Sequence, residues 1–294
     1  MPGRACHTTM ELDRLRSYSS VFTRSVFSRL VKFDDFTAID QVGKIYDGGR
    51  CSKEMTYSGY LDWMYSMLSH GYRNEYVYKN TLVNKIVSLN KARNVVVFNE
   101  FRVGDSIADV ATFNGKSCVY EIKTELDSPK RLAGQAEDYL RFFQECYVVV
   151  PADLADEYLS VIDDRMGVYT MTDVKGCPSV KKFRPAVKLT DNLDVDVLMR
   201  VLWISEYEHI VKVYFGDLPD VGYYEMSGAC WDLIRRIPVD KLSKMAVEEI
   251  KRRKNNPVIF DNGIKSLTQI CLAMNFNQRQ YAHLLDNLNR TINF

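Results

Sequence analysis

Residues 106–123 read SIADVATFNGKSCVYEIK, and this stretch decides the fold. It contains two runs of strand-forming side chains, separated by the turn residues Asn114 and Gly115. A third such run, NVVVFNEF at 94–101, precedes them. Connections this short join neighbouring antiparallel strands, so the sequence predicts a three-stranded antiparallel meander.

Charged side chains interrupt the apolar pattern of this meander. Asp109 lies in the second strand, and Glu121 and Lys123 share one face of the third because strand side chains alternate. A strict two-residue turn would pair Asp109 with Tyr120 and send Glu121 to the opposite side. A three-residue loop over 114–116, or a bulge near Asp109, would place Asp109 opposite Glu121. A functional site therefore requires the longer loop or a bulge.

The segments around the meander complete an α/β core. Asn74 is expected to be the N-cap of a preceding helix, and a second helix is expected after Pro129, to about Phe143. CYVVVP at 146–151 is a continuous apolar run, typical of a strand buried on both faces. A helix at 152–162 and a short strand at 167–172 follow. This order predicts an α/β protein whose mixed sheet is covered by helices.

The flanking regions are predicted to be helical. The expected division is a helical N-terminal cap (1–70), a core (71–189) and a helical C-terminal region (190–294). A basic stretch that contains Pro178 and Pro185 is predicted to be a connector at the end of the core.

Bulk composition narrows the class of protein. The chain has 294 residues, of which 46% are hydrophobic and 26% charged, as in ordinary globular proteins. A net charge of +1 neither demands nor excludes a polyanionic partner. The seven cysteines form no CxxC pair and are expected to be reduced thiols in a cytoplasmic protein. No long apolar run is present, so no membrane partner is expected.

The carboxylates of the meander indicate a metal site. Two carboxylates that converge repel each other unless a cation lies between them, and hard oxygen ligands suit Mg²⁺ or Mn²⁺. A lysine two residues beyond the second carboxylate can orient the attacking water and stabilise charge that builds up on a phosphate. The chemistry implied is phosphodiester hydrolysis.

The sequence has Asp109, then eleven residues, then Glu121-Ile122-Lys123. This motif and its spacing resemble the PD-(D/E)XK nuclease superfamily, which has a restriction-endonuclease-like core. The resemblance implies that Asp109 and Glu121 bind metal together with the main-chain carbonyl of Ile122. It also implies that Lys123 is catalytic. Ala108 stands where the superfamily usually has proline or another small residue.

The helix after the meander extends this resemblance. Gln135 and Tyr139 are four residues apart, hence on one helical face. They resemble the QxxxY motif of the RecB-like and lambda-exonuclease-like branches, where it helps to fix the site and contacts DNA. Glu75 resembles the helical glutamate that joins the metal ligands in these branches, and Glu100 is the alternative. Over about residues 60–260 the chain is similar to an uncharacterised bacterial family of such proteins.

Other charged residues are left outside the predicted site. Glu125 and Asp127 are expected to solvate the strand end or to cap the next helix. The basic run IKRRKNN at 250–256 is expected to be a solvated helix end rather than a DNA contact.

The order of these motifs predicts a Mg²⁺- or Mn²⁺-dependent nuclease of bacterial or phage origin, with DNA favoured over RNA as substrate. Two alternatives remain open. One is a non-catalytic nuclease-fold module that binds or regulates in a defence or mobile-element setting, and the other is an RNA-directed nuclease. The flanking helical regions are where a protein partner or a second copy of the chain would bind.

Overall fold

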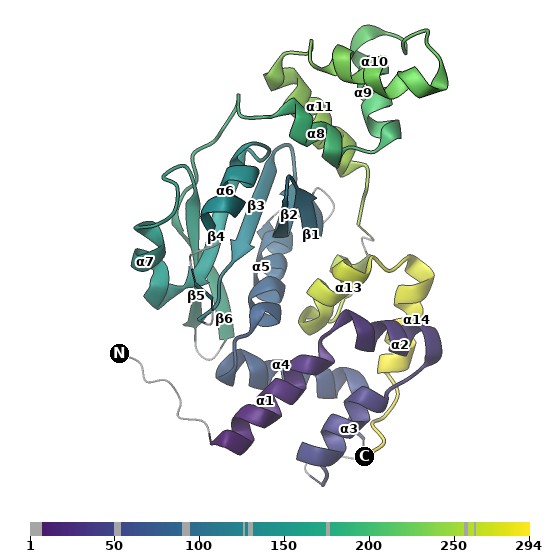
Figure 1. Ribbon diagram of the computed structural model, residues 1–294. Helices are drawn as coiled ribbons and strands as arrows, with labels where there is room; N and C mark the ends of the chain where they lie inside the picture. The colour runs from purple at the N-terminus through teal and green to yellow at the C-terminus, as the bar shows by residue number, and fades with distance from the viewer. Residues whose placement is uncertain are drawn as a thin grey trace. The chain divides into compact units, whose positions relative to one another are not determined.

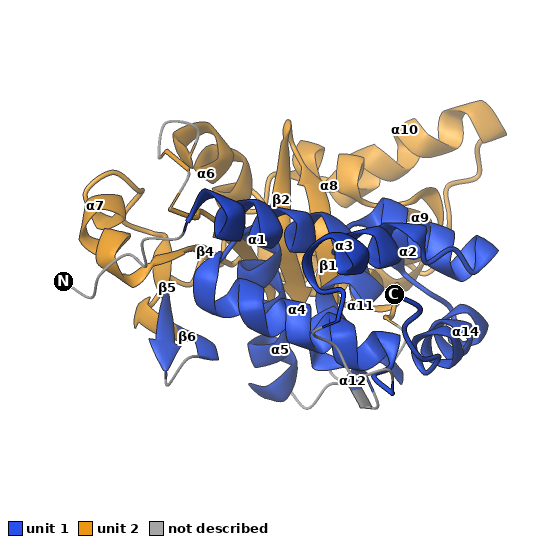
Figure 2. Ribbon diagram, turned by 90° about the horizontal axis from the view of Figure 1, so that it is seen from below, with its two compact units in different colours: residues 1–92, 171–180, 256–294 blue, residues 93–170, 181–255 orange. Residues whose placement is uncertain are grey.

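The computed structural model describes residues 8–49, 54–89, 95–125, 127–128, 132–174, 177–255, 258–261 and 263–294. The chain forms two compact units, shown in separate colours in Figure 2. The first contains residues 1–92, 171–180 and 256–294, and the second contains residues 93–170 and 181–255. The three-part division expected from the sequence stays a prediction.

The first unit combines helices from both ends of the chain. They are α1 (Thr9–Val21), α2 (Arg24–Phe33), α3 (Thr37–Tyr46), α4 (Tyr57–Gly71), α5 (Glu75–Leu89), α12 (Val258–Asp261), η3 (Lys265–Leu267), α13 (Thr268–Met274) and α14 (Gln278–Leu288). Helix α13 packs on α2 and α5, and α14 packs on α2 and α4. Asn74 Oδ1 accepts a hydrogen bond from the Val77 N–H at 3.1 Å, so the predicted N-cap of α5 is confirmed.

A mixed six-stranded sheet has the order β1-β2-β3-β4-β5-β6 (Figure 1). The strands are β1 (Val96–Val103), β2 (Ser106–Phe113), β3 (Ser117–Ile122), β4 (Glu145–Pro151), β5 (Gly167–Val174) and β6 (Cys177–Arg184). The pairs β1–β2 and β2–β3 are antiparallel, and β3–β4 is parallel. Helix α6 (Leu132–Leu140) connects the two parallel strands and contacts β2 and β4. The predicted α/β class and meander are therefore confirmed.

The predicted connector after β5 is wrong over residues 177–184, which form β6. Strand β6 is hydrogen-bonded to β5 at one edge of the sheet. Pro178 is the second residue of β6, and proline is tolerated near the start of an edge strand. Charged side chains are also common on edge strands, because they discourage pairing with other chains. Residues 171–180, which include the end of β5 and the start of β6, belong to the first unit.

Helices complete the second unit. They are η2 (Ala152–Leu154), α7 (Ala155–Leu159), α8 (Val195–Val201), α9 (Ile204–Phe215), α10 (Tyr223–Ile234) and α11 (Val239–Lys251). Helix α7 contacts β4, α8 contacts β1 and α11 contacts β2, so their apolar side chains share one core with the sheet. Among the described residues, no helix has the length and apolar character needed to cross a membrane.

The sequence predicts that the basic run at 250–256 is a solvated helix end. This is only partly correct, because Arg253 and Asn255 make internal contacts. Arg253 donates from Nε and from its NH2 group to the two carboxylate oxygens of Glu206, both at 2.6 Å. Its guanidinium also lies 4.3 Å from the ring centroid of Trp203. Asn255 exchanges two hydrogen bonds with the main chain of Val97, at 2.7 and 2.9 Å. Arg253 and Asn255 therefore make contacts within the second unit.

Candidate functional site

The loop between β2 and β3 has the length that a shared site requires. Strand β2 ends at Phe113 and β3 begins at Ser117, which leaves a three-residue loop. Within it, Gly115 has a φ of 64°, in the left-handed region that favours glycine. The pairing runs from Phe113–Ser117 to Val110–Tyr120, and one further step in this register would set Asp109 opposite Glu121. The predicted three-residue loop is confirmed, and so is the register that follows from it as far as Val110 and Tyr120.

Asp109 lies where β2 and β3 cease to pair. The ladder ends at Val110 and Tyr120, although β2 begins at Ser106 and β3 continues to Ile122. Beyond it, Asp109 Oδ2 accepts a hydrogen bond from the Ile122 N–H at 2.7 Å. Because the N–H and C=O of one strand residue point to the same edge, the Ile122 carbonyl also faces β2. Asp109 and the Ile122 carbonyl, both predicted metal ligands, are therefore neighbours.

Glu121 is the centre of a buried hydrogen-bond network. Its Oε1 accepts from Lys123 Nζ at 2.8 Å and from Gln135 Nε2 at 2.7 Å. Its Oε2 accepts from the Tyr139 hydroxyl at 2.7 Å. Lys123 Nζ also donates to Gln135 Oε1 at 3.1 Å. Burial of a carboxylate is tolerated when charge and hydrogen bonds compensate it, as they do here. Four of the predicted site residues thus contact one another.

Tyr139 donates, rather than accepts, in this network. Its side chain is fully buried, and its hydroxyl also contacts the main-chain oxygen of Ile107 at 3.2 Å. Burial raises the pKa of Tyr139 far above its usual value, and the charge of Glu121 and the hydrogen bond to Glu121 raise it further. The phenol therefore stays protonated and holds the Glu121 carboxylate in place.

Strand β1 has an irregularity directly across from Asp109. The pairs Asn99–Val110 and Phe101–Ala108 leave Glu100 opposite Asp109. Glu100 has a φ of 58°, which residues other than glycine rarely adopt inside a strand. The side-chain alternation shifts there, because the rings of Phe98 and Phe101 both contact Phe113, at centroid distances of 5.7 and 5.4 Å. No sequence signal marks this distortion, and strained backbone is often found next to functional groups.

Three other acidic residues lie outside this network. Glu75 is the first residue of α5 in the first unit, 62% exposed and 2.5 Å from Lys79. Asp127 Oδ2 accepts from the N–H and the hydroxyl of Thr124, at 2.8 and 2.9 Å, and so closes the turn after β3. Glu125 lies within that turn. The structure thus gives Asp127 a local role, in a turn rather than at a helix cap.

The donor set suits a hard divalent cation but contributes few acidic ligands. Within the described residues, no group of three or more His, Cys, Asp or Glu side chains could hold a metal. Asp109, Glu121 and the Ile122 carbonyl are all oxygen donors, which Mg²⁺ and Mn²⁺ prefer. Magnesium commonly takes one or two carboxylates and completes its shell with water and phosphate. The residues present therefore fit such an ion.

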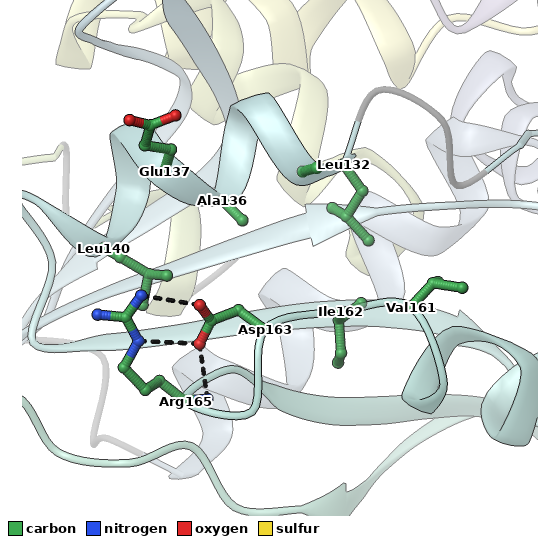
Figure 3. Close-up of a pocket in the computed structure, with 9 residues that line it drawn as sticks. Leu132, Ala136, Glu137, Leu140, Val161, Ile162, Asp163 and Arg165 are labelled. Carbon is green, nitrogen blue, oxygen red and sulfur yellow. Dashed lines mark hydrogen bonds and ion pairs between the residues drawn. The ribbon is translucent and has the colours of Figure 1, made fainter.

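A separate cavity of about 410 Å³ lies along α6, beside residues of the helix other than Gln135 and Tyr139 (Figure 3). Leu132, Ala136 and Leu140 line it from the helix, and Ile162 lines it from the segment after α7. At its edge, the Arg165 guanidinium donates to both carboxylate oxygens of Asp163, at 2.9 and 2.7 Å. None of the predicted site residues lines this cavity.

The fold and the site define an α/β protein whose mixed sheet carries a buried Glu-Lys-Gln-Tyr network beside a half-buried aspartate. Residues 69–270 match the family model of bacteriophage P4 protein cII. The chain belongs to this family, since the match covers more than half of it. All the predicted site residues lie within the matched segment.

The likeness to other known proteins is slight. A solved structure, the SPO1766 protein of unknown function from Silicibacter pomeroyi, is 14% identical and covers 50% of this chain and 97% of its own. Its TM-score of 0.31 is too low for the likeness to bear on the fold. No curated protein matches the chain.

Proposed function

We propose that the protein is a Mg²⁺- or Mn²⁺-dependent nuclease with a restriction-endonuclease-like core, and that DNA is its favoured substrate. The observation that supports this most is that Asp109 accepts a hydrogen bond from the Ile122 N–H at 2.7 Å, next to Glu121, which in turn accepts one from Lys123 at 2.8 Å. Asp109, Glu121 and the Ile122 carbonyl would hold the ion. The ion would neutralise phosphate charge and lower the pKa of the attacking water.

Lys123 is proposed to position that water and to stabilise charge on the phosphate. An ammonium group has three N–H donors, and within the described residues Glu121 and Gln135 accept two of them. The third can reach a water or a phosphate oxygen. Because Lys123 is only 8% exposed, its attraction to a phosphate is screened less than that of a surface lysine.

Gln135 and Tyr139 are proposed to hold the Glu121 carboxylate in one orientation. They bind different oxygens of Glu121, so the carboxylate cannot rotate without breaking a hydrogen bond. Preorganised groups of this kind need no rearrangement during the reaction. Gln135 is partly exposed and is proposed to contact the substrate as well.

Cleavage assays on the full chain test this proposal. Linear, circular and single-stranded DNA and RNA would each be incubated with Mg²⁺ or Mn²⁺. We expect Lys123→Ala and Glu121→Gln to lower the cleavage rate by about 100-fold or more, since each removes a charge from the reacting centre. Glu137→Ala, on the exposed side of α6, is the matched control and should cleave like the wild type. Wild-type protein that cuts no nucleic acid, or variants that cut equally well, would refute the proposal.

A non-catalytic binding or regulatory module is the second candidate. It is favoured by the closed network itself, in which both oxygens of Glu121 already accept hydrogen bonds from protein donors. Titration calorimetry with Mn²⁺ separates the two functions. Binding that disappears in Glu121→Gln supports the nuclease, whereas no binding that depends on Glu121 supports the module.

A further inference from the structure

Helix α6 is tied to the turn between β1 and β2 by the residue next to Tyr139. Asp138 Oδ2 accepts a hydrogen bond from the Ser106 hydroxyl at 2.6 Å and another from the Asp105 N–H at 3.1 Å. One carboxylate oxygen therefore holds the turn and the first residue of β2. Asp138 belongs to none of the sequence motifs that predict the site.

Gly104 allows this close approach. A Cβ atom at this position would lie 2.3 Å from Asp138 Oδ1, far inside van der Waals contact. Gly104 also has a φ of 57°, which glycine adopts without the steric cost of a side chain. Both the short distance to Asp138 and the positive φ therefore favour glycine at position 104.

The contacts continue along the chain in both elements. Tyr139, which follows Asp138, contacts the main-chain oxygen of Ile107, which follows Ser106. Four consecutive residues from Gly104 to Ile107 are therefore held against two consecutive residues of α6. Asp109 lies two residues beyond this contact, on the part of β2 that does not pair with β3.

This arrangement links the two carboxylates of the site. The same helix binds Glu121 through Gln135 and Tyr139 and binds the start of β2 through Asp138. Where β2 and β3 have separated, no backbone ladder between them sets the distance from Asp109 to Glu121. Pairing with β1 and the contact with α6 hold that part of β2 instead.

We infer that Asp138 is a positioning residue that sets Asp109 relative to Glu121 by clamping the start of β2 to α6. The effect of Asp138 on the cleavage rate rests on the proposed nuclease function. Its effect on the position of Asp109 does not. The Ile122 N–H reports on the clamp, because it donates to Asp109 across the separated strands.

Amide hydrogen exchange of the full chain tests the clamp without metal or nucleic acid. We expect Asp138→Ala to speed exchange of the Ile122 amide by about tenfold or more, since two hydrogen bonds are lost, while the Val119 amide in the paired part of β3 is unchanged. Asp138→Asn keeps an acceptor oxygen and should restore most of the protection. Glu137→Ala is the matched control on the same helix. Unchanged Ile122 exchange in Asp138→Ala, or equal acceleration of Ile122 and Val119, would overturn the inference.

Cleavage kinetics then separate the clamp from the proposed function. If the wild type is a nuclease, Asp138→Ala should lower kcat by about tenfold with little change in KM, and Asp138→Asn should recover most of it. A wild type without nuclease activity, but with the expected change in Ile122 exchange, refutes the nuclease and leaves the clamp standing. A nuclease in which Asp138→Ala leaves Ile122 exchange unchanged refutes the clamp alone.

Discussion

Among single residues, Tyr139 shows how the network stabilises a buried charge. Tyr139→Phe removes the donor to Glu121 Oε2 while it keeps the shape of the ring. We expect the free energy of unfolding to fall by about 1–3 kcal/mol, because a buried carboxylate oxygen loses its hydrogen bond. Urea denaturation followed by circular dichroism would measure it.

Tyr158 provides the matched control for this substitution. Its side chain is also buried, but its hydroxyl has no hydrogen-bond partner among the described residues. Tyr158→Phe should therefore change the free energy of unfolding by less than about 1 kcal/mol. An equal loss in both variants would mean that the bond to Glu121 contributes nothing specific.

Asp163 gives the stability a defined pH dependence. The hydrogen bonds from Arg165 lower the pKa of Asp163 to about 2. A carboxylate with a lowered folded-state pKa stabilises the protein above its unfolded pKa of about 3.9 and loses that effect as the pH falls towards 2. Because the side chain is 32% exposed, we expect Asp163→Asn to cost no more than about 1 kcal/mol at pH 7.

Denaturation between pH 2 and pH 7 would check this dependence. The difference between wild type and Asp163→Asn should be largest above pH 4 and should shrink steadily as the pH falls towards 2. Asp164→Asn is the control, since the Asp164 side chain is fully exposed and lies 4.0 Å from Arg184. A constant difference at every pH would show that the charge of Asp163 is not its cause.

At the scale of elements, the loop between β2 and β3 sets the register on which the site depends. Gly115 has a positive φ, and a Cβ there would meet no atom within 4 Å. Any cost of a side chain therefore comes from the backbone conformation. We expect Gly115→Val to lower the free energy of unfolding by about 1–2 kcal/mol, and Gly115→Asn, which tolerates this φ better, to lower it less. Thermal unfolding of both variants would test this, and equal losses would contradict it.

Elements also differ in how far local sequence predicts them. The meander, α6 and β4 were predictable, because each has its own periodicity and its own turn residues. Strand β6 was not, since its charged residues and proline are compatible with a loop and only pairing with β5 makes them a strand. The contacts of Arg253 are not predictable from local sequence for a similar reason. Its partners Glu206 and Trp203 are almost fifty residues away in the sequence.

Across the whole molecule, charge is divided unequally between the two units. The first contains 17 Lys and Arg against 12 Asp and Glu, and the second contains 22 against 26. A protein that binds DNA needs positive charge near the phosphates, so we expect the first unit to contribute most of it. Lys32→Gln with Lys44→Gln, both exposed in the first unit, should weaken DNA binding and reduce the salt dependence of log K by up to about 0.9 for each phosphate that is no longer neutralised.

Lys244→Gln with Lys254→Gln is the matched pair in the second unit, where both residues are exposed. Fluorescence anisotropy with labelled DNA at several salt concentrations would compare the two pairs, with Ca²⁺ in place of Mg²⁺ to limit cleavage. A larger loss of affinity from the second pair would locate the DNA surface in the second unit and contradict the expectation.

Local sequence patterns predict the order of helices and strands around the meander and nominate the residues of the proposed site. Periods of two and of 3.6 residues and turn signals are local, so they can be read without the fold. The tertiary structure alone decided that the ladder ends beside Asp109, that Glu100 is distorted across from it, and that Asp138 holds β2 to α6. These features depend on contacts between residues distant in sequence, and no local spacing encodes such contacts.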